Sequence, residues 1–416
     1  MKTVIMAGGL GKRIKEINDS IPKPLIMVNG KPVLEREIEC LSKQGFKDII
    51  ITVSYMKEKI IDHFKDGKDF GVNIEYFIEE EPLGNAGALF ELKDKLTDDF
   101  LLINADSIFD IDLNRFVNFH YQHKGLASLF VHPNNHPYDS GLIILDDNNQ
   151  VIEWLNKEED RPKWYRNIVN AGMHILSPEL LNNRPDTTKV DLDRQILKPL
   201  ANKNLLYAYK SSEYIKDMGT PERYKQVRDD FGNNLPFKRN LVNKQKAIFL
   251  DRDGTINKYK GFLNNIDDFE LIDDIAENIK KINSSEYLCI VVSNQPVIAR
   301  GELSFDGLDE IHKKMETLLG LKGAYIDGLY YCPHHPDSGF EGEIKELKID
   351  CDCRKPKPGM LIKASKDFNI DLSKSYMIGD SDNDIKAGNA ADCKSYKINS
   401  DDSISNIIRE ILTTNL

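Results

Sequence analysis

The sequence predicts two α/β domains joined by a short linker. Its 416 residues exceed what one ordinary core takes, at roughly 100 to 200 residues per domain. Short Val/Ile-rich runs alternate with helix-like segments in residues 1–231, and the same alternation restarts at residue 246. Residues 232–245 lose this periodicity and gather Asn, Gly, Pro and Lys, which is typical of a linker. We therefore expect one domain over 1–231 and a second over 246–416.

In the first domain, each strand-like run is followed by a helix-like segment. This order predicts βαβ units and a parallel sheet. The expected strands are 3–6, 48–53, 73–77 and 100–104, and the expected helices include 33–44 and 56–64.

The composition excludes two classes of partner. Hydrophobic residues make up 40% and charged residues 30%, and no apolar run approaches the roughly 18 residues of a membrane helix. The start of the chain is typical of a first strand and not of a signal peptide, so we expect a cytoplasmic protein without a membrane partner. A net charge of -11 argues against nucleic acid as a partner. A homo-oligomer is compatible with the sequence.

Glycines and basic residues follow the first strand. Gly8, Gly9 and Gly11 form a turn that lets backbone N–H groups approach phosphates, while Arg13 and then Lys23 can neutralise them. Such a turn predicts a site for a phosphorylated ligand.

Further along the chain, a second glycine-rich loop covers residues 81–88, and the buried strand 100–104 leads to Asp106. A carboxylate at the carboxyl end of a parallel strand lies on the edge where open α/β sheets bind ligands. Asp217 adds a second carboxylate before another turn.

These motifs, in this order, resemble the sugar nucleotidyltransferase family. The resemblance implies a Rossmann-like domain with a mixed sheet that transfers a nucleotidyl group from an NTP to a sugar 1-phosphate and releases pyrophosphate. It also implies site residues: Arg13 and Lys23 on the reacting phosphates, Gly8, Gly9, Gly11, Pro82, Leu83 and Gly84 around the nucleotide, Gly141, Lys157, Asn170 and Gly172 around the sugar, and Asp106 and Asp217 as Mg²⁺ ligands. Because both reactants are anions, metal and basic residues must supply most of the catalysis.

Two departures from the family pattern concern this domain. Asn156 precedes Lys157 where the family often has Glu, and Ala105 replaces a common Gly before the metal aspartate. Within the family, residues 81–84, 106–112 and 217–222 are most similar to guanylyltransferases of D-glycero-D-manno-heptose 1-phosphate.

The second domain restarts the strand and helix alternation. Strand-like runs at 247–250, 287–292 and 375–378 alternate with helix-like segments at 275–282 and 305–319. The first of these strands ends in Asp251, Arg252, Asp253 and Gly254. Two carboxylates two residues apart can serve as nucleophile and as acid/base, with Gly254 permitting the turn.

This pattern resembles the haloacid dehalogenase superfamily of phosphatases, whose other motifs follow as Ser293, Lys355 and Asp380. The resemblance implies a Rossmann-like fold with a minimal cap, in which Asp251 attacks phosphorus and Asp253 acts as acid and base. Ser293 and Lys355 would hold the phosphoryl oxygens. Mg²⁺ would lie on Asp251, Asp380 and the backbone carbonyl of Asp253, with Asp384 orienting these ligands.

A cysteine-rich segment lies between these motifs. Cys332 and His334, followed by Cys351 and Cys353, offer four ligands, enough to close a tetrahedral structural Zn²⁺ site. His335 is the competing imidazole; the resemblance, which uses the Cys-x-His spacing, implies His334.

The zinc loop narrows the resemblance to the branch containing D-glycero-D-manno-heptose 1,7-bisphosphate 7-phosphatase and histidinol phosphatase. Residues 293–302 are similar to the heptose enzyme, with Pro296-Val297 as a departure. By that likeness Asn294, Arg300 and Arg354 bind substrate, and the two arginines hold the phosphate that is not cleaved.

The two resemblances imply consecutive steps: removal of the 7-phosphate, then coupling of the heptose 1-phosphate to GTP, giving a precursor of lipopolysaccharide or capsule. Three alternatives stay open. Both domains act on another sugar or polyol phosphate with another NTP, the first domain is a regulatory nucleotide-binding module, or the second resembles a histidinol phosphatase.

Overall fold

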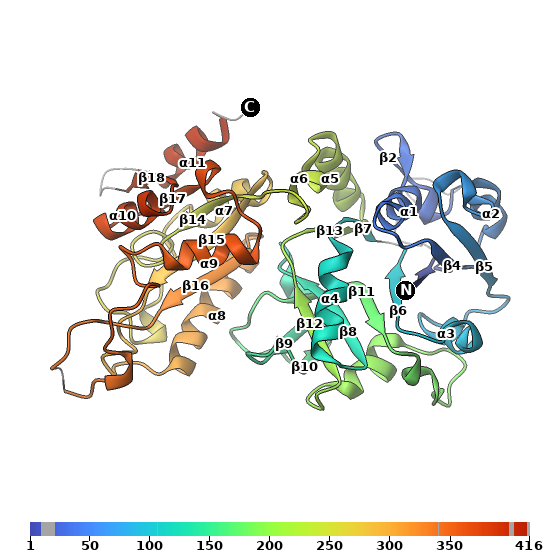
Figure 1. Cartoon of the computed structure of the whole chain (residues 1–416), viewed down its shortest axis with the longest axis horizontal. Coiled ribbons are helices and arrows are strands. Elements are labelled where there is room, and N and C mark those ends of the chain that lie inside the picture. The colour runs from blue at the N-terminus through green and yellow to red at the C-terminus, as the bar shows by residue number, and fades with distance from the viewer. Residues whose placement is uncertain (10–20, 106, 340, 399–402, 414–416) are drawn as a thin grey trace. The chain divides into compact units, whose positions relative to one another are not determined.

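The computed structural model describes residues 1–9, 21–105, 107–339, 341–398 and 403–413 (Figure 1). The chain divides into two compact units. The first comprises Met1–His132, Ile143–Leu155 and Asn170–Asn240; the second comprises Pro133–Leu142, Asn156–Val169 and Leu241–Leu416.

The first unit is built on a mixed sheet, as expected. Strand β1 (Lys2–Met6) pairs in parallel with β4 (Asp48–Val53) and β6 (Phe100–Asn104), and β4 pairs in parallel with β5 (Asn73–Ile78). Strand β11 (Val169–Leu176) runs antiparallel to β6. The order along the sheet is β10-β9-β11-β6-β1-β4-β5, with β8 paired to β11 and β12.

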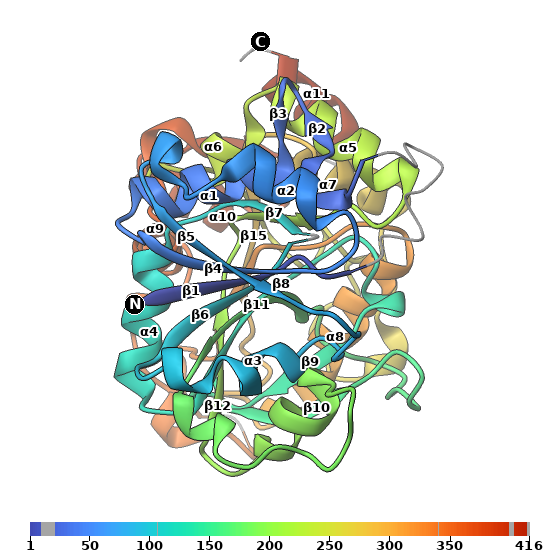
Figure 2. The ribbon, with the colours of Figure 1, turned by 90° about the vertical axis from the view of Figure 1, so that its right-hand side faces the viewer.

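Helices cover both faces of this sheet. Helix α1 (Val33–Lys43) precedes β4 and α2 (Lys57–Phe64) precedes β5, so these two crossovers run along the sheet in one direction. Helix α3 (Gly87–Glu91) precedes β6, on the other side of β1. Right-handed crossovers therefore place α3 on the face opposite to α1 and α2, as Figure 2 shows. Because both faces are covered, the central strands are mostly apolar, and their polar residues Thr3 and Thr52 are fully buried.

A two-stranded ribbon flanks the carboxyl end of β6. Strand β7 (Ser107–Asp110) pairs antiparallel with β13 (Tyr214–Asp217), and Ser107 lies opposite Asp217. The other elements drawn from residues 1–240 are β2 (Met27–Val28), β3 (Lys31–Pro32), α4 (Leu113–His123), β8 (Ala127–His132), β9 (Leu142–Leu145), β10 (Val151–Leu155), β12 (Leu206–Lys210), α5 (Pro221–Gly232) and α6 (Leu235–Arg239).

The second unit is built on a parallel sheet of order β16-β15-β14-β17-β18. Its strands are β14 (Lys246–Leu250), β15 (Tyr287–Asn294), β16 (Gly328–Cys332), β17 (Tyr376–Gly379) and β18 (Lys394–Lys397). The predicted strands of the second domain match β14, β15 and β17 to within two residues at each end.

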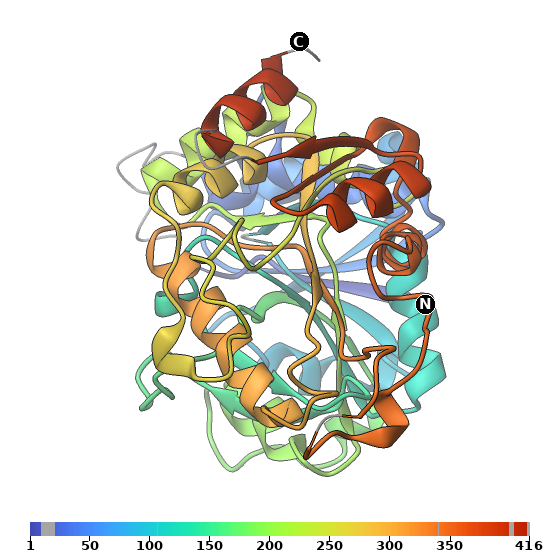
Figure 3. The ribbon, with the colours of Figure 1, turned by 90° about the vertical axis from the view of Figure 1, so that its left-hand side faces the viewer.

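Helices also sandwich this sheet. Helices α7 (Ile275–Asn283), α8 (Phe305–Leu321) and α11 (Ile404–Thr413) contribute to one apolar core. Helices α9 (Gly359–Asp367) and α10 (Asp382–Ala390) contribute to a second core. Figure 3 shows these two groups of helices on opposite sides of the strands. This arrangement leaves the carboxyl ends of the strands as the edge where a ligand can bind.

The boundary between the two units, at Asn240 and Leu241, lies inside the expected linker, part of which is helical. Residues 232–245 contain helix α6, and its Leu235 is buried in an apolar cluster with Val28 and Tyr214. The loss of periodicity in the sequence reflects a helix too short to display one.

The compact units differ from the expected domains in two segments of residues 1–231. Pro133–Leu142 and Asn156–Val169 group with the second unit. Within that unit, Arg166 forms ion pairs with Asp309 at 2.5 Å and with Glu316 at 2.6 Å. Contacts made by single charged side chains leave no periodic pattern in the sequence.

Candidate active sites and metal centre

Three predicted residues of the phosphatase motifs lie along one edge of the second sheet. Asp251 follows β14, and its backbone N–H donates to the carbonyl of Ile378 in β17 at 3.0 Å. Ser293 lies at the end of β15, and Asp380 follows β17. Because β14, β15 and β17 are parallel neighbours, all three residues belong to the carboxyl edge.

Lys355 links this edge to the loop that follows β16. Its Nζ donates to Asp251 Oδ1 at 2.7 Å and to the Val292 carbonyl at 2.8 Å, and it lies 2.5 Å from Asp384 Oδ1. Burial lowers the pKa of Lys355, but the carboxylates of Asp251 and Asp384 outweigh it, so the pKa is raised. Burial also raises the pKa of Asp251, and Lys355 opposes that shift. The ammonium is therefore a fixed positive charge beside the candidate nucleophile.

Three carboxylates at this edge can hold a metal ion. Asp251, Asp380 and Asp384 offer oxygens that all lie within 4.8 Å of one another. Gly254 makes room for them: its φ is +83°, and a Cβ there would lie 2.0 Å from Asp380 Oδ2. Asp384 is fixed because its Oδ2 accepts the Ser381 N–H at 3.0 Å. An all-oxygen set is what Mg²⁺ prefers.

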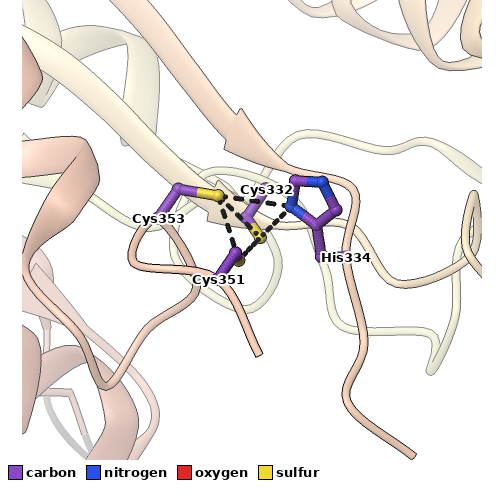
Figure 4. Close-up of side chains that lie close together, drawn as sticks. All are labelled: Cys332, His334, Cys351 and Cys353. Carbon is purple, nitrogen blue, oxygen red and sulfur yellow. Dashed lines mark hydrogen bonds between the residues drawn. The ribbon is translucent and has the colours of Figure 1, made fainter. Parts of the chain in front are cut away.

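The four residues predicted to bind zinc come together in one cluster (Figure 4). Cys353 Sγ lies 3.2 Å from the Sγ atoms of Cys332 and Cys351 and 3.4 Å from His334 Nδ1. The alternative imidazole is engaged elsewhere, because His335 Nδ1 accepts the N–H of Asp337. Three thiols and an imidazole form a soft donor set of the kind that binds Zn²⁺ in structural sites.

The predicted substrate-binding residues of the second domain have defined partners. Asn294 forms a pair of hydrogen bonds with the backbone of Lys355, at 2.9 and 3.0 Å, so it positions that lysine. Arg300 pairs with Glu302 at 2.5 Å and lies over the ring of Phe262. Arg354 donates to the carbonyl of His334 at 3.1 Å, which ties it to the cysteine cluster.

In the first unit, the two predicted nucleotide loops meet at a carboxylate. Glu79 is buried and accepts the N–H of Leu83 at 3.4 Å, and a Cβ on Gly8 would lie 2.8 Å from its Oε1. Burial raises the pKa of Glu79. Gly84 has a φ of +85°, and a Cβ there would lie 2.4 Å from the carbonyl of Val190. Glycine is thus required at the tip of the second loop.

The other predicted nucleotide-site residues that the structure describes are Gly9, Pro82, Leu83 and Lys23. Gly9 follows Gly8 beyond β1, and Pro82 is exposed beside the half-buried Leu83. Lys23 is half-buried and begins the 3-10 helix Lys23–Leu25.

Asp217, a predicted metal ligand, ends β13. It lies opposite Ser107, the residue that follows Asp106 in sequence. Both of its carboxylate oxygens accept from Arg223 Nη1, at 2.9 and 3.0 Å, and its Oδ1 also accepts the N–H of Gly219. An arginine therefore holds this carboxylate in the structure.

The predicted sugar-pocket residues fall into two groups. Asn170 and Gly172 lie in β11, where Asn170 Oδ1 accepts the N–H of Gly172 at 3.2 Å. Gly172 has a φ of +75°, and a Cβ there would lie 2.8 Å from Asn104 Nδ2 at the end of β6. Gly141 and Lys157 lie in segments of the second unit. Their joint role stays a prediction.

Three predicted residues, Gly11, Arg13 and Asp106, lie outside the described residues. Conversely, sequence reasoning gave no role to Glu79, Arg223, Arg252 or Gln295. Arg252 and Gln295 stand inside the quoted motifs, next to Asp253 and near Ser293, and that position was their only signal.

The fold and the sites define a class: a two-unit α/β protein whose second sheet carries a carboxylate cluster at the carboxyl ends of parallel strands, with a separate cysteine–histidine cluster. A family model described as nucleotidyl transferase matches residues 2–233, more than half of the chain. A second, described as HAD-hydrolase-like, matches residues 352–403.

Curated relatives are consistent with this class. D-glycero-beta-D-manno-heptose-1,7-bisphosphate 7-phosphatase of Pasteurella multocida (strain Pm70) is 45% identical over 150 residues, covering 36% of this chain and 79% of the relative. The phosphatase of the same description from Haemophilus influenzae is 44% identical over 149 residues, covering 36% and 78%. The chain belongs to the nucleotidyl transferase family and, through these relatives, to the family of heptose bisphosphate phosphatases.

Solved structures are also similar to part of the chain. HddC from Yersinia pseudotuberculosis is 28% identical with a TM-score of 0.48, covering 55% of this chain and 99% of that one. A putative glucose-1-phosphate thymidylyltransferase from Bacillus anthracis is 22% identical with a TM-score of 0.49, covering 55% and 94%. Among the helices of the described residues, none has the length and apolar character needed to cross a membrane.

Proposed function

We propose that the chain catalyses two consecutive reactions in nucleotide-sugar synthesis. The domain over 246–416 removes the 7-phosphate of D-glycero-D-manno-heptose 1,7-bisphosphate. The domain over 1–231 then couples the heptose 1-phosphate to GTP, giving GDP-heptose and pyrophosphate. The product is a precursor of surface polysaccharide, and both reactions take place in the cytoplasm.

One observation carries the phosphatase half: Lys355 bridges Asp251 and Asp384 at the carboxyl edge, beside Asp380. A buried lysine that neutralises two carboxylates suits a site where a third anion, the phosphoryl group, must approach. The substrate class follows from relatives that are 44–45% identical and named for the heptose bisphosphate.

The phosphatase reaction uses residues of this chain as nucleophile and as acid/base. An Asp251 oxygen bonds to phosphorus while the bond from phosphorus to the sugar oxygen breaks, and Asp253 gives that oxygen its proton. Asp253 then takes a proton from the water that attacks the acyl phosphate, which releases inorganic phosphate and restores Asp251. Ser293 and Lys355 bind the phosphoryl oxygens. Mg²⁺ held by Asp251 and Asp380 would screen the charge of the phosphate.

The nucleotidyltransferase half needs no protein nucleophile, because the sugar phosphate itself attacks the α-phosphate of the NTP. Asp106 and Asp217 would hold Mg²⁺. The pairing of Ser107 with Asp217 supports this, because Ser107 directly follows Asp106 in the sequence. Arg13 and Lys23 would neutralise the triphosphate. The preference for GTP rests on the sequence resemblance in residues 81–84, 106–112 and 217–222.

Zn²⁺ in the cluster of Cys332, His334, Cys351 and Cys353 has a structural role in this proposal. These four residues would supply all the ligands of a four-coordinate ion, so no open position would remain for substrate. The cluster ends one residue before Arg354 and two before Lys355. The metal thereby fixes the loop that delivers both basic residues.

The test is to incubate the protein with Mg²⁺, each anomer of heptose 1,7-bisphosphate and each of the four NTPs. Phosphate, pyrophosphate and nucleotide sugar are followed together. Release of both ions with GDP-heptose from one anomer is the expected result. Phosphate release without pyrophosphate under every NTP would contradict the transferase half, and no phosphate release from either anomer would contradict the substrate of the phosphatase.

A further inference from the structure

A fully buried arginine separates the two aspartates of the phosphatase motif. The side chain of Arg252 is 0% exposed. Its Nη2 donates to both oxygens of Asp253, each at 2.8 Å, and its Nε donates to Oδ1 at 3.2 Å. A buried guanidinium is costly unless a carboxylate and further acceptors satisfy it. The fork of Arg252 therefore fixes the plane of the Asp253 carboxylate.

The same arginine fixes the orientation of Gln295. Arg252 Nη2 lies 3.1 Å from Gln295 Oε1. Arginine has only donors and does not lose its proton, so the amide oxygen must face it and the amide nitrogen must face away. Gln295 Nε2 accordingly donates to Asp253 Oδ2 and to Ser293 Oγ, each at 2.8 Å. Because Ser293 Oγ accepts this bond, its own hydrogen can be directed at a phosphoryl oxygen.

The remaining corner of the guanidinium is closed by a neutral group. Arg252 Nη1 lies 3.3 Å from His312 Nε2, and His312 is fully buried in α8. Burial, with the nearby positive charges of Arg252 and Arg166, holds the pKa of His312 well below its usual value. A neutral imidazole accepts through Nε2 without adding a negative charge. Asp253 thus has no anionic competitor for Arg252 at this corner.

The bonds from Arg252 and Gln295 hold the Asp253 carboxylate against competing positive charges at this edge. Lys355 attracts carboxylates and already contacts those of Asp251 and Asp384. A freely rotating Asp253 would be drawn towards the same charge or the metal and away from the leaving oxygen. Arg252 and Gln295 hold it by its two oxygens, and Asn257 Nδ2 adds a bond to Oδ1 at 3.0 Å.

We propose that Arg252 and Gln295 are positioning residues that orient the acid/base Asp253 and the phosphoryl-binding Ser293 for phosphate ester cleavage. The inference rests on the proposed phosphatase function. Neither residue touches the reacting atoms. Their effect passes through Asp253, which must protonate the leaving oxygen, and it should therefore depend on how much the leaving group needs that proton.

The experiment compares two leaving groups in the full-length protein. Heptose 1,7-bisphosphate loses an alkoxide, which needs a proton, whereas p-nitrophenyl phosphate loses a phenolate, which does not. We expect Arg252→Met to lower kcat for the bisphosphate by roughly 10²- to 10³-fold, within the range for acid–base catalysis. The rate constant of the first-turnover nitrophenolate burst should change by less than about three-fold. Arg252→Lys, which keeps the charge without the fork, should recover only part of kcat.

Gln295→Met supplies a second variant, because loss of a buried arginine can prevent folding. It leaves the bonds between Arg252 and Asp253 in place, so we expect a drop of about ten-fold in the ratio of alkyl to aryl rates. Equal losses on both substrates, or an unchanged ratio in a variant with wild-type thermal unfolding, would overturn the proposal. If the wild type ignores the heptose bisphosphate but cleaves another alkyl phosphate such as glycerol phosphate, the proposed substrate fails and the ratio is measured on that ester.

Discussion

The aspartates of the two candidate sites differ in how far their side chains are exposed to solvent. In the second unit, the side chain of Asp251 is 11% exposed and its partner Lys355 is 3% exposed. In the first unit, Asp217 is 36% exposed and pairs with Arg223, itself 28% exposed. Both aspartates adjoin strand ends, yet one is enclosed by the protein and the other faces a partner at the surface.

This difference matches the chemistry proposed for each site. A covalent phosphatase uses its own aspartate as nucleophile, so the carboxylate must stand in place before substrate arrives. A nucleotidyltransferase uses the substrate as nucleophile, and its carboxylates act only through a metal that comes with the NTP. On the proposed function, Arg223 would be a replaceable partner, which Mg²⁺ would displace from Asp217. On this proposal, folding alone places the carboxylate of the enclosed site, whereas binding of the NTP and its metal places the carboxylate of the open site.

The largest expected effect comes from removing the enclosed nucleophile, which tests whether the two sites act independently. Asp251→Asn should abolish phosphate release, with a loss of more than about 10⁴-fold, because an amide oxygen does not form the acyl phosphate. Pyrophosphate release from heptose 1-phosphate and GTP should stay within about two-fold and is the internal control. Loss of both activities would show that the two sites are not independent.

The reciprocal change is Asp217→Asn in the first unit. Loss of one metal-ligating charge should lower the rate of pyrophosphate release by roughly 10²- to 10³-fold and raise the Mg²⁺ concentration needed for half-maximal rate. Phosphate release should be unchanged. Asp229→Asn is the matched control, since Asp229 is an exposed carboxylate of α5 that pairs with Lys225. If the two variants behave alike, Asp217 is not a metal ligand.

Removing zinc tests whether the folded structure of the second unit depends on the cysteine–histidine cluster. Cys351→Ser should release the metal and lower the Tm of the phosphatase domain by roughly 10 °C, because the binding energy of a structural metal is folding energy. Metal analysis and calorimetry measure both effects. Cys393→Ser, at a buried cysteine of the adjoining core, should keep its zinc. Unchanged zinc content in Cys351→Ser would contradict the ligand set.

Sequence reasoning succeeded where contacts are local and failed where they are not. The strands β1, β4 and β14 were predictable because both of their faces are buried and most of their residues are apolar. Asp251 and Lys355 were found only because their motifs resemble a family. The distance of 2.7 Å between them joins residues 104 positions apart, which no periodicity reports.

The missed residues follow the same rule. Arg252 lies in a quoted motif, but only its burial and its bonds to Gln295 and His312 reveal a role. Glu79 at the end of β5 was unremarkable in sequence, since its significance comes from the approach of Gly8 and Leu83. Helix α6, within the expected linker, was not predicted because five residues cannot display a period of 3.6.

The smallest expected effect comes from comparing two glycines of the second unit. The comparison distinguishes the cost of backbone strain from a change in the geometry of the site. Gly254 and Gly261 both have positive φ, +83° and +74°, so the backbone conformation alone should make alanine at either cost about 1–2 kcal/mol of stability. Only at Gly254 would the new Cβ meet Asp380, at 2.0 Å, whereas no atom lies within 4 Å at Gly261. Gly254→Ala should therefore also raise the Mg²⁺ requirement of phosphate release several-fold, and Gly261→Ala should not. Equal Mg²⁺ dependence in the two variants, measured beside their unfolding curves, would mean that Asp380 can move aside and that this edge is less rigid than its burial implies.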